Sequence, residues 1–353
     1  MRRGLPRPLM RAVAVGAVLA AVAAPWLVDD YTTALLARTL LLGLVGVSVA
    51  LLTGVAGLPT LGQTAPFAAG AYAGAALSLH TGSVGVVQLA AGAAVGAAFA
   101  LVTVPLVVYA RGVVVLMITL AIGELAVVAA NRWRSVTGGT DGLYGMPSAP
   151  PVWGLPVLDT ERARYLYVLV VVAIVAGVTL AVLRTPAGLL LRASRDDEAR
   201  MRASGHGVTG YFAVAYLAAG AIAGTAGSLL VTAQQYVSPA DFGFEISALL
   251  LLGVVIGGTA SIGGAIAGTA LVVVARDWLS GLLPGHAPLV LGVLFVLTAY
   301  LLPRGVAGLL GDGRGLTWLA GRRRSGARPA GERTAVPGAD AAGDATESRR
   351  VSA

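Results

Sequence analysis

Four polar side chains interrupt an apolar stretch of this sequence and are its first candidates for chemistry. They are Thr60, Gln63, Thr64 and Tyr72, and Pro59 and Pro66 break the same stretch. In an apolar environment, a helix broken by glycine or proline can turn hydroxyl and amide groups toward a cavity. We therefore expect these four residues to line a pathway for a small polar solute.

An acid, Glu124, lies inside another long apolar run. If that run spans a bilayer, a charge there costs roughly 2.5–3.5 kcal/mol even on the milder insertion scales. The carboxylate should then face protein or water. It can contact the cationic end of a substrate, or it can pair with Arg132 or Arg134 and fix helix packing. We favour the structural role and keep Glu124 among the pathway candidates.

The residues that the sequence lacks exclude several kinds of chemistry. It contains no cysteine and no lysine, which excludes disulfides, thiolate metal sites, cysteine nucleophiles and the lysine of a phosphate-binding loop. His80, His206 and His286 are far apart and share no metal-ligand spacing. No nucleophile and base are clustered. We expect neither an enzyme nor a metal or cofactor site in this chain.

The composition indicates a membrane protein. Of the 353 residues, 57% are hydrophobic and 12% are charged, against roughly 25% charged in a soluble domain. Apolar runs of the length that a bilayer requires predict about ten transmembrane helices, some broken or re-entrant, in an all-α polytopic bundle. The runs fall at about 10–28, 34–53, 60–80, 84–110, 112–130, 165–183, 209–231, 246–262, 264–283 and 287–303.

The arginines indicate how the bundle is oriented. Those near the amino terminus, Arg111, those from 184 to 202 and those of the carboxyl tail fall on one side, which the positive-inside rule makes cytoplasmic. Because the charge of +8 follows topology, we expect no nucleic-acid partner. We predict a transmembrane domain over 1–310, a disordered cytoplasmic tail over 311–353, a retained first helix, and both termini in the cytoplasm.

Two loops between the apolar runs have distinctive sequences. The inner loop, 184–208, suits a short charged helix that ends at Gly205, with Glu198 and Arg202 spaced i, i+4; its basic residues also fit a plain inner loop. The outer loop, 131–164, contains Thr137, Gly138, Gly139, Asp141 and Gly142. Its glycines allow positive φ angles, and it is either a surface that receives a partner protein or a rigid turn.

Glycines spaced four residues apart recur in the predicted helices, for example at Gly220 and Gly224. Such pairs let helix backbones approach closely. With 48 glycines in the chain, they indicate dense packing and no specific dimer interface.

Several local patterns occur in an order that resembles a known family. They include Gly54 to Gln63, Thr119-Leu120-Ala121 with Glu124, Thr137 to Gly142, the charged inner loop, Tyr236-Val237-Ser238-Pro239, and Pro303-Arg304-Gly305. From about residue 40 to 310, the chain resembles the hydrophobic permease subunit of the branched-chain amino acid ABC importers.

The resemblance implies a function and a set of partners. Arg192, Arg195, Asp196, Glu198 and Gly205 would belong to a coupling helix that docks on a separate ATPase subunit. The partners would be a second homologous permease, two ATP-binding cassette subunits that bind ATP, and an extracytoplasmic substrate-binding protein that docks on the outer loop. The complex would lie in the bacterial inner membrane and carry branched-chain or related amino acids. An ion-coupled secondary transporter of small polar solutes is the alternative.

Overall fold

The computed structural model is an all-α bundle, and it describes residues 19–81, 84–154, 156–259 and 261–282, together with positions 16, 289, 292 and 293. Seven of the described helical segments are long and apolar enough to cross a bilayer. The long segments are α2 (Asp30–Ala50) with the π-helical turn η1 (Leu51–Ala56), α4 (Gly85–Val108), α5 (Val113–Arg132), α7 (Glu161–Leu183), α10 (Val208–Gln234), η3 (Pro239–Phe242) with α11 (Phe244–Gly257), and α12 (Ile262–Leu282). The predicted polytopic helical fold is confirmed.

Of the three remaining predicted spans, one is described in full and two only in part. The run at 60–80 becomes α3 (Thr64–Thr81). Of the first run, the described part is helical over 19–27. Residues 10–15, most of the last run at 287–303, and the tail at 311–353 lie outside the described residues.

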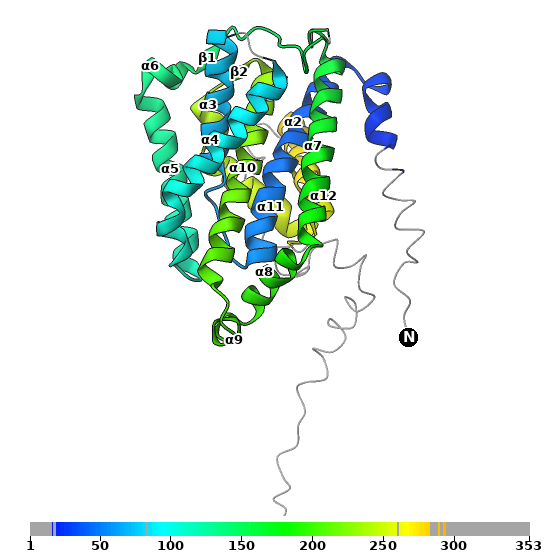
Figure 1. The fold of residues 1–353 in the computed structure, drawn as a ribbon. Helices are drawn as coiled ribbons and strands as arrows, with labels where there is room; N and C mark the ends of the chain where they lie inside the picture. Colours follow the sequence, from blue (N-terminus) through cyan, green and yellow to red (C-terminus); the bar gives the residue numbers. More distant parts are fainter. Residues whose placement is uncertain are drawn as a thin grey trace, which may run out of the picture. The chain divides into compact units, whose positions relative to one another are not determined.

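The helix α2 forms the centre of the bundle (Figure 1). It packs against α7, α10, α11 and α12. Every residue from Leu41 to Ala50 is buried, so this half of α2 needs no polar face. A helix that is apolar all round is stable only when protein or lipid covers every side, and here protein covers it.

Glycines allow three helices to touch backbone to backbone. A methyl group built on Gly70 of α3 would lie 2.2 Å from the carbonyl oxygen of Gly224 in α10, and one on Gly224 would lie 2.1 Å from that of Gly92 in α4. The same kind of contact joins α11 to α12, where a methyl group on Gly257 would meet the carbonyl oxygen of Gly264. These glycines pack helices within the chain, which confirms the expected dense packing.

The bundle has two distinct ends (Figure 1). At one, called the β end here, β1 (Leu143–Tyr144) pairs antiparallel with β2 (Tyr236–Val237), in the register Leu143 to Val237. The opposite end, called the α8–α9 end, holds α8 (Pro186–Asp196) and α9 (Glu198–Ala203). Two short helices, α6 (Arg134–Thr137) and η2 (Gly139–Asp141), precede β1. The outer loop is therefore partly ordered, and the pairing of β1 with β2 was not predicted.

A non-helical break separates η1 from α3. Gly57 has φ +75°, and the amide of Leu58 donates to the carbonyl of Leu52 at 2.9 Å, as in a glycine-terminated helix. Pro59 follows and cannot continue the ladder because it has no N–H. The chain re-enters helix at Thr64, so the break occupies the segment 57–63.

Candidate functional site

The predicted pathway residues of the break are buried between two helices. Thr60, Gln63 and Thr64 are all at most 2% exposed. The Thr64 hydroxyl lies 2.9 Å from that of Ser247 in α11. On the other side, the Leu61 amide donates to the Thr119 hydroxyl of α5 at 3.2 Å. The break is thus held by α11 and α5 together.

Two polar atoms near this region lack hydrogen-bond partners. Gln63 Oε1 and the Tyr72 hydroxyl are buried with no partner among the described residues. Tyr72 lies further along α3, where its ring centroid is 5.8 Å from that of Phe242. An unsatisfied buried polar group costs roughly 1–3 kcal/mol. The structure therefore retains two groups able to hydrogen-bond a solute or water.

Glu124 faces away from the break. Its neighbour Gly123 is the residue that approaches Thr64, at 3.5 Å from a built methyl group to the hydroxyl oxygen. Glu124 itself is exposed, and no ion pair joins it to Arg132, Arg134 or any other described residue. The proposed structural pair is not formed within this chain.

The inner loop folds as two helices where one was expected. Asp197 has φ −153° and ψ 87°, which ends α8, and its carboxylate then accepts a hydrogen bond from the Arg200 amide at 3.0 Å. An aspartate that caps a new helix explains the break, since its side chain satisfies an otherwise free amide. The expected pair between Glu198 and Arg202 forms at 2.7 Å, and Gly205, with φ +82°, follows the end of α9.

Arg195 connects α8 to the end of η1. Its guanidinium donates to the carbonyl of Gly54, one of the last carbonyls of the helical segment. Such carbonyls lack partners within a helix and attract cations. Pro59 cannot donate to the Gly54 carbonyl because it has no N–H. The arginine stem crosses Gly57, where a methyl group would lie 2.6 Å from Arg195 Cγ. The inner loop thus touches the chain just before the break. Arg192 and Asp196 are exposed on α8.

Arg111 makes a second connection, which sequence reasoning missed. It lies in the turn between α4 and α5, and its Nη2 and Nε donate to the two carboxylate oxygens of Glu198 at 2.7 and 2.9 Å. The guanidinium also lies 5.5 Å from the ring centroid of Phe212. Hydrogen bonds from Arg111, and secondarily Arg202, lower the pKa of Glu198 although partial burial opposes them. Only the basic character of this end hinted at Arg111.

Most of the selected outer-loop residues build a turn. Gly138, Gly139 and Gly142 have φ between +67° and +74°. The Thr137 hydroxyl donates to backbone carbonyls of Ala130 and Trp133 at 2.5 and 2.8 Å. A methyl group on Gly142 would meet the Val237 carbonyl oxygen at 2.3 Å. Asp141 is exposed, so it is the selected residue whose side chain is free to meet another protein.

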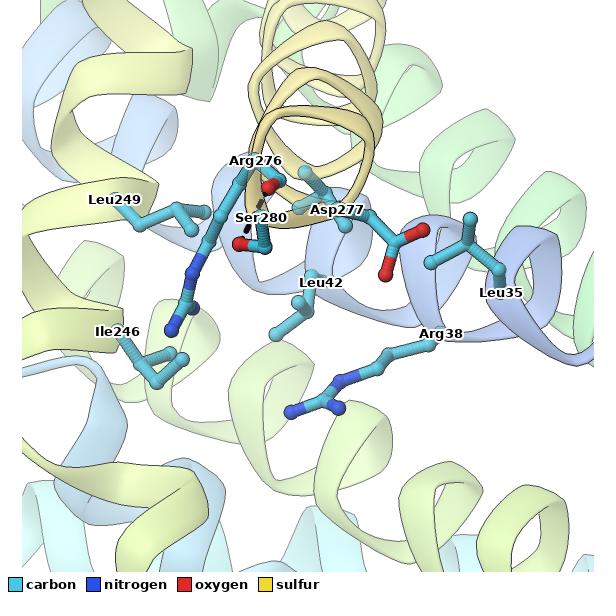
Figure 2. A pocket seen from close by; sticks show the side chains of 9 residues that line it. Leu35, Arg38, Leu42, Ile246, Leu249, Arg276, Asp277 and Ser280 are labelled. Carbon is cyan, nitrogen blue, oxygen red and sulfur yellow. Dashed lines mark hydrogen bonds between the residues drawn. The ribbon is translucent and has the colours of Figure 1, made fainter. Parts of the chain in front are cut away.

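Two cavities at the β end contain no predicted pathway residue. One, of about 230 Å³, is lined by Leu35, Arg38, Leu42, Ile246, Leu249, Val273, Arg276, Asp277 and Ser280 (Figure 2). The other, of about 340 Å³, shares Leu35, Arg38 and Asp277 with it. In the described part of the chain, no three His, Asp or Glu side chains are grouped to hold a metal ion.

Comparison with known proteins gives a consistent result. The family model for the branched-chain amino acid transport system permease component matches residues 31–299. The chain is 30% identical over 315 residues to the high-affinity branched-chain amino acid transport system permease protein LivM of Escherichia coli, covering 83% of this chain and 73% of LivM. It is 29% identical over 316 residues to the LivM of Salmonella typhimurium, covering 81% and 72%. No solved structure matches the chain.

Proposed function

The chain belongs to the branched-chain amino acid transport system permease family, and from this premise we propose its substrate, its partners and the roles of its residues. It is a multi-pass permease subunit of an ABC transport system, and members of this family transport without a catalytic site or a cofactor of their own. ATP is bound by partner subunits in such systems.

We propose that the chain forms the translocation pathway for branched-chain or related amino acids. Its partners are a second homologous permease, two ATP-binding cassette subunits and an extracytoplasmic binding protein. The observation that carries this proposal is the family match over residues 31–299, which includes all the candidate pathway, coupling and outer-loop residues.

The distribution of arginine supports an orientation. The α8–α9 end carries Arg111 and the arginines of α8 and α9, so the positive-inside rule makes it cytoplasmic. In this proposal the β end faces outward and both termini lie in the cytoplasm.

The exposed face of α5 is the surface that the second permease covers in this proposal. Glu124 and the apolar side chains of Met117, Leu125 and Val128 are exposed on it. A carboxylate inside a span faces protein or water and not lipid, so a lipid-covered α5 would be costly. In this arrangement Glu124 lies at the subunit boundary, and Gln63 and Tyr72 lie inside the subunit beyond α5. All three side chains are then available to the substrate pathway.

The α8–α9 end is the surface for the ATPase subunits. It exposes Arg192 and Asp196 together with Leu189, which is 61% exposed although it is apolar. A movement of this loop is transmitted to the break by the contact between Arg195 and Gly54. It is transmitted to the start of α5 by the contact between Glu198 and Arg111. The two routes meet where Leu61 bonds to Thr119.

The β end is the surface for the binding protein. Asp141 and Tyr144 are exposed there, while Thr137, Gly138, Gly139 and Gly142 fix the shape of the turn that presents them. The pairing of β1 with β2 anchors this turn to α10.

Reconstitution tests the proposal. The chain is incorporated into liposomes with its partner subunits, ATP inside and the binding protein with radiolabelled leucine outside. We expect uptake that requires both ATP and the binding protein and that valine and isoleucine inhibit. Uptake driven by an ion gradient without ATP would indicate a secondary transporter and overturn the proposal.

A further inference from the structure

The 230 Å³ cavity at the β end has two charged poles and an apolar wall. Arg38 from α2 and Arg276 and Asp277 from α12 line it together with five aliphatic side chains. Figure 2 shows the Arg276 and Asp277 side chains leaving α12 in different directions, so the positive and negative groups are separated. A cavity of this kind is suited to a ligand that carries both charges.

The two arginines have donors to spare. A guanidinium carries five N–H donors. Within the described residues, Arg38 makes one side-chain hydrogen bond, to Asp241 at 3.3 Å, and Arg276 makes one, to Glu245 at 2.5 Å. Most of their donors are therefore available, and guanidinium groups bind carboxylates strongly and with defined geometry.

The opposite pole has an available acceptor. The carboxylate of Asp277 accepts a hydrogen bond from the Tyr31 hydroxyl at 3.2 Å. No arginine in the described part of the chain lies within ion-pair distance of it. Within the described residues its negative charge is thus not paired with a cation, and it can receive an ammonium group.

We propose that this cavity binds an aliphatic α-amino acid as a zwitterion. The carboxylate of the amino acid contacts Arg38 and Arg276, its ammonium group contacts Asp277, and its side chain packs against Leu42, Ile246 and Val273. A zwitterion brings no net charge into the cavity. Its carboxylate uses the remaining donors of Arg38 and Arg276, which are already paired with Asp241 and Glu245, and its ammonium group supplies a cation for Asp277.

The size of the cavity agrees with this ligand. At about 30 Å³ per water molecule, a volume of 230 Å³ corresponds to roughly eight waters, and leucine has nine non-hydrogen atoms. The choice of an amino acid among zwitterions rests on the proposed function. The site would hold substrate on the permease itself, at the end where the binding protein releases it.

Direct binding to the intact transporter tests the site. The full complex is placed in nanodiscs that contain no aminophospholipid, and radiolabelled leucine is titrated without ATP or binding protein. We expect saturable binding that Arg38→Gln and Asp277→Asn each weaken about tenfold to a hundredfold, as for loss of a hydrogen bond to a charged group. The matched control is Arg162→Gln, because Arg162 is exposed at the same end and lines neither cavity.

Competition with two leucine analogues tests the zwitterion. We expect weak competition by 4-methylpentanoate, which lacks the ammonium group, and by 3-methylbutylamine, which lacks the carboxylate. Asp277→Asn keeps the test decisive if Arg38→Gln fails to assemble, because the described partner of Asp277 is a single tyrosine hydroxyl.

Three results would overturn the inference. They are absence of saturable leucine binding, binding that neither substitution weakens, and equal competition by the analogue without an ammonium group. Native mass spectrometry supplies another arm: an aminophospholipid retained through Arg38 and Asp277, and not displaced by leucine, would make this a lipid site. Normal ATP-driven uptake together with any of these results leaves the proposed function intact.

Discussion

Removing the Arg111 guanidinium should weaken the connection between the inner loop and α5. Exposed ion pairs contribute about 0.2–1 kcal/mol. The two-pronged contact with Glu198, whose side chain is 28% exposed against 42% for Arg111, places this pair at the upper end of that range. The contact with Phe212 adds about 0.5–1 kcal/mol. Arg111→Ala should therefore cost about 1–2 kcal/mol, a factor of about 5–30 in the docked population.

The assay measures uptake and ATP hydrolysis in the same liposomes. We expect Arg111→Ala to lower the amount of leucine transported per ATP hydrolysed, because the ATPase surface of α8 stays intact while its contact with α5 is lost. Arg111→Lys should recover only part of this ratio, since an ammonium group cannot reproduce the two-pronged geometry.

Arg202→Ala is the matched control. Arg202 bonds to the same carboxylate oxygen at 2.7 Å but belongs to α9 itself, so its loss leaves the connection to α5 in place. In a Glu198→Gln background, Arg111→Ala should have little further effect. An unchanged transport-to-hydrolysis ratio in Arg111→Ala, or an equal loss in Arg202→Ala, would refute the reasoning.

Three further predictions follow from local geometry. Gly70→Ala places a methyl group 2.2 Å from the Gly224 carbonyl oxygen and should abolish folded protein in detergent, which size-exclusion chromatography would show. The control is Gly177→Ala, which adds its methyl group in open space and should keep the wild-type melting temperature. Gly142→Ala, at φ +74°, should separate β1 from β2 and increase proteolysis near residue 142, but not in α8. Because the pKa of Glu198 is lowered in the folded protein, its stabilising contribution is complete at neutral pH and lost as the pH falls through the lowered pKa. The difference in melting temperature between wild type and Glu198→Gln should therefore be constant near pH 7, begin to shrink as the pH falls below the ordinary glutamate pKa of about 4.3, and disappear once the pH lies below the lowered pKa of Glu198. A difference that does not shrink in acid would contradict the assignment.

The spans and the break were predictable because each depends on local sequence. A bilayer requires about 20 apolar residues per helix, and this requirement located α2, α4, α5, α7, α10 and α12. The break at 57–63 follows from Gly57 and Pro59, whose backbone restrictions act within a few residues. The pair between Glu198 and Arg202 was predictable for the same reason.

Contacts between distant segments were not predictable. Arg111 and Glu198 are 87 positions apart, and no spacing rule relates them. The pairing of β1 with β2 involves two residues on each strand, too few to produce an alternating pattern. The division of the inner loop depended on whether Asp197 continued α8 or capped α9, and both are compatible with its sequence. The cavity at the β end needed α2, α11 and α12 to be placed together.

The contacts between glycine backbones determine which parts of the permease can move. Where α3, α4 and α10 touch through main-chain atoms, no side chain lies at the contact that could rotate to accommodate a closer approach. We therefore expect these three helices to move together during transport. The change of access would then take place at the border of this group, where the non-helical glycine and proline segment separates η1 from α3.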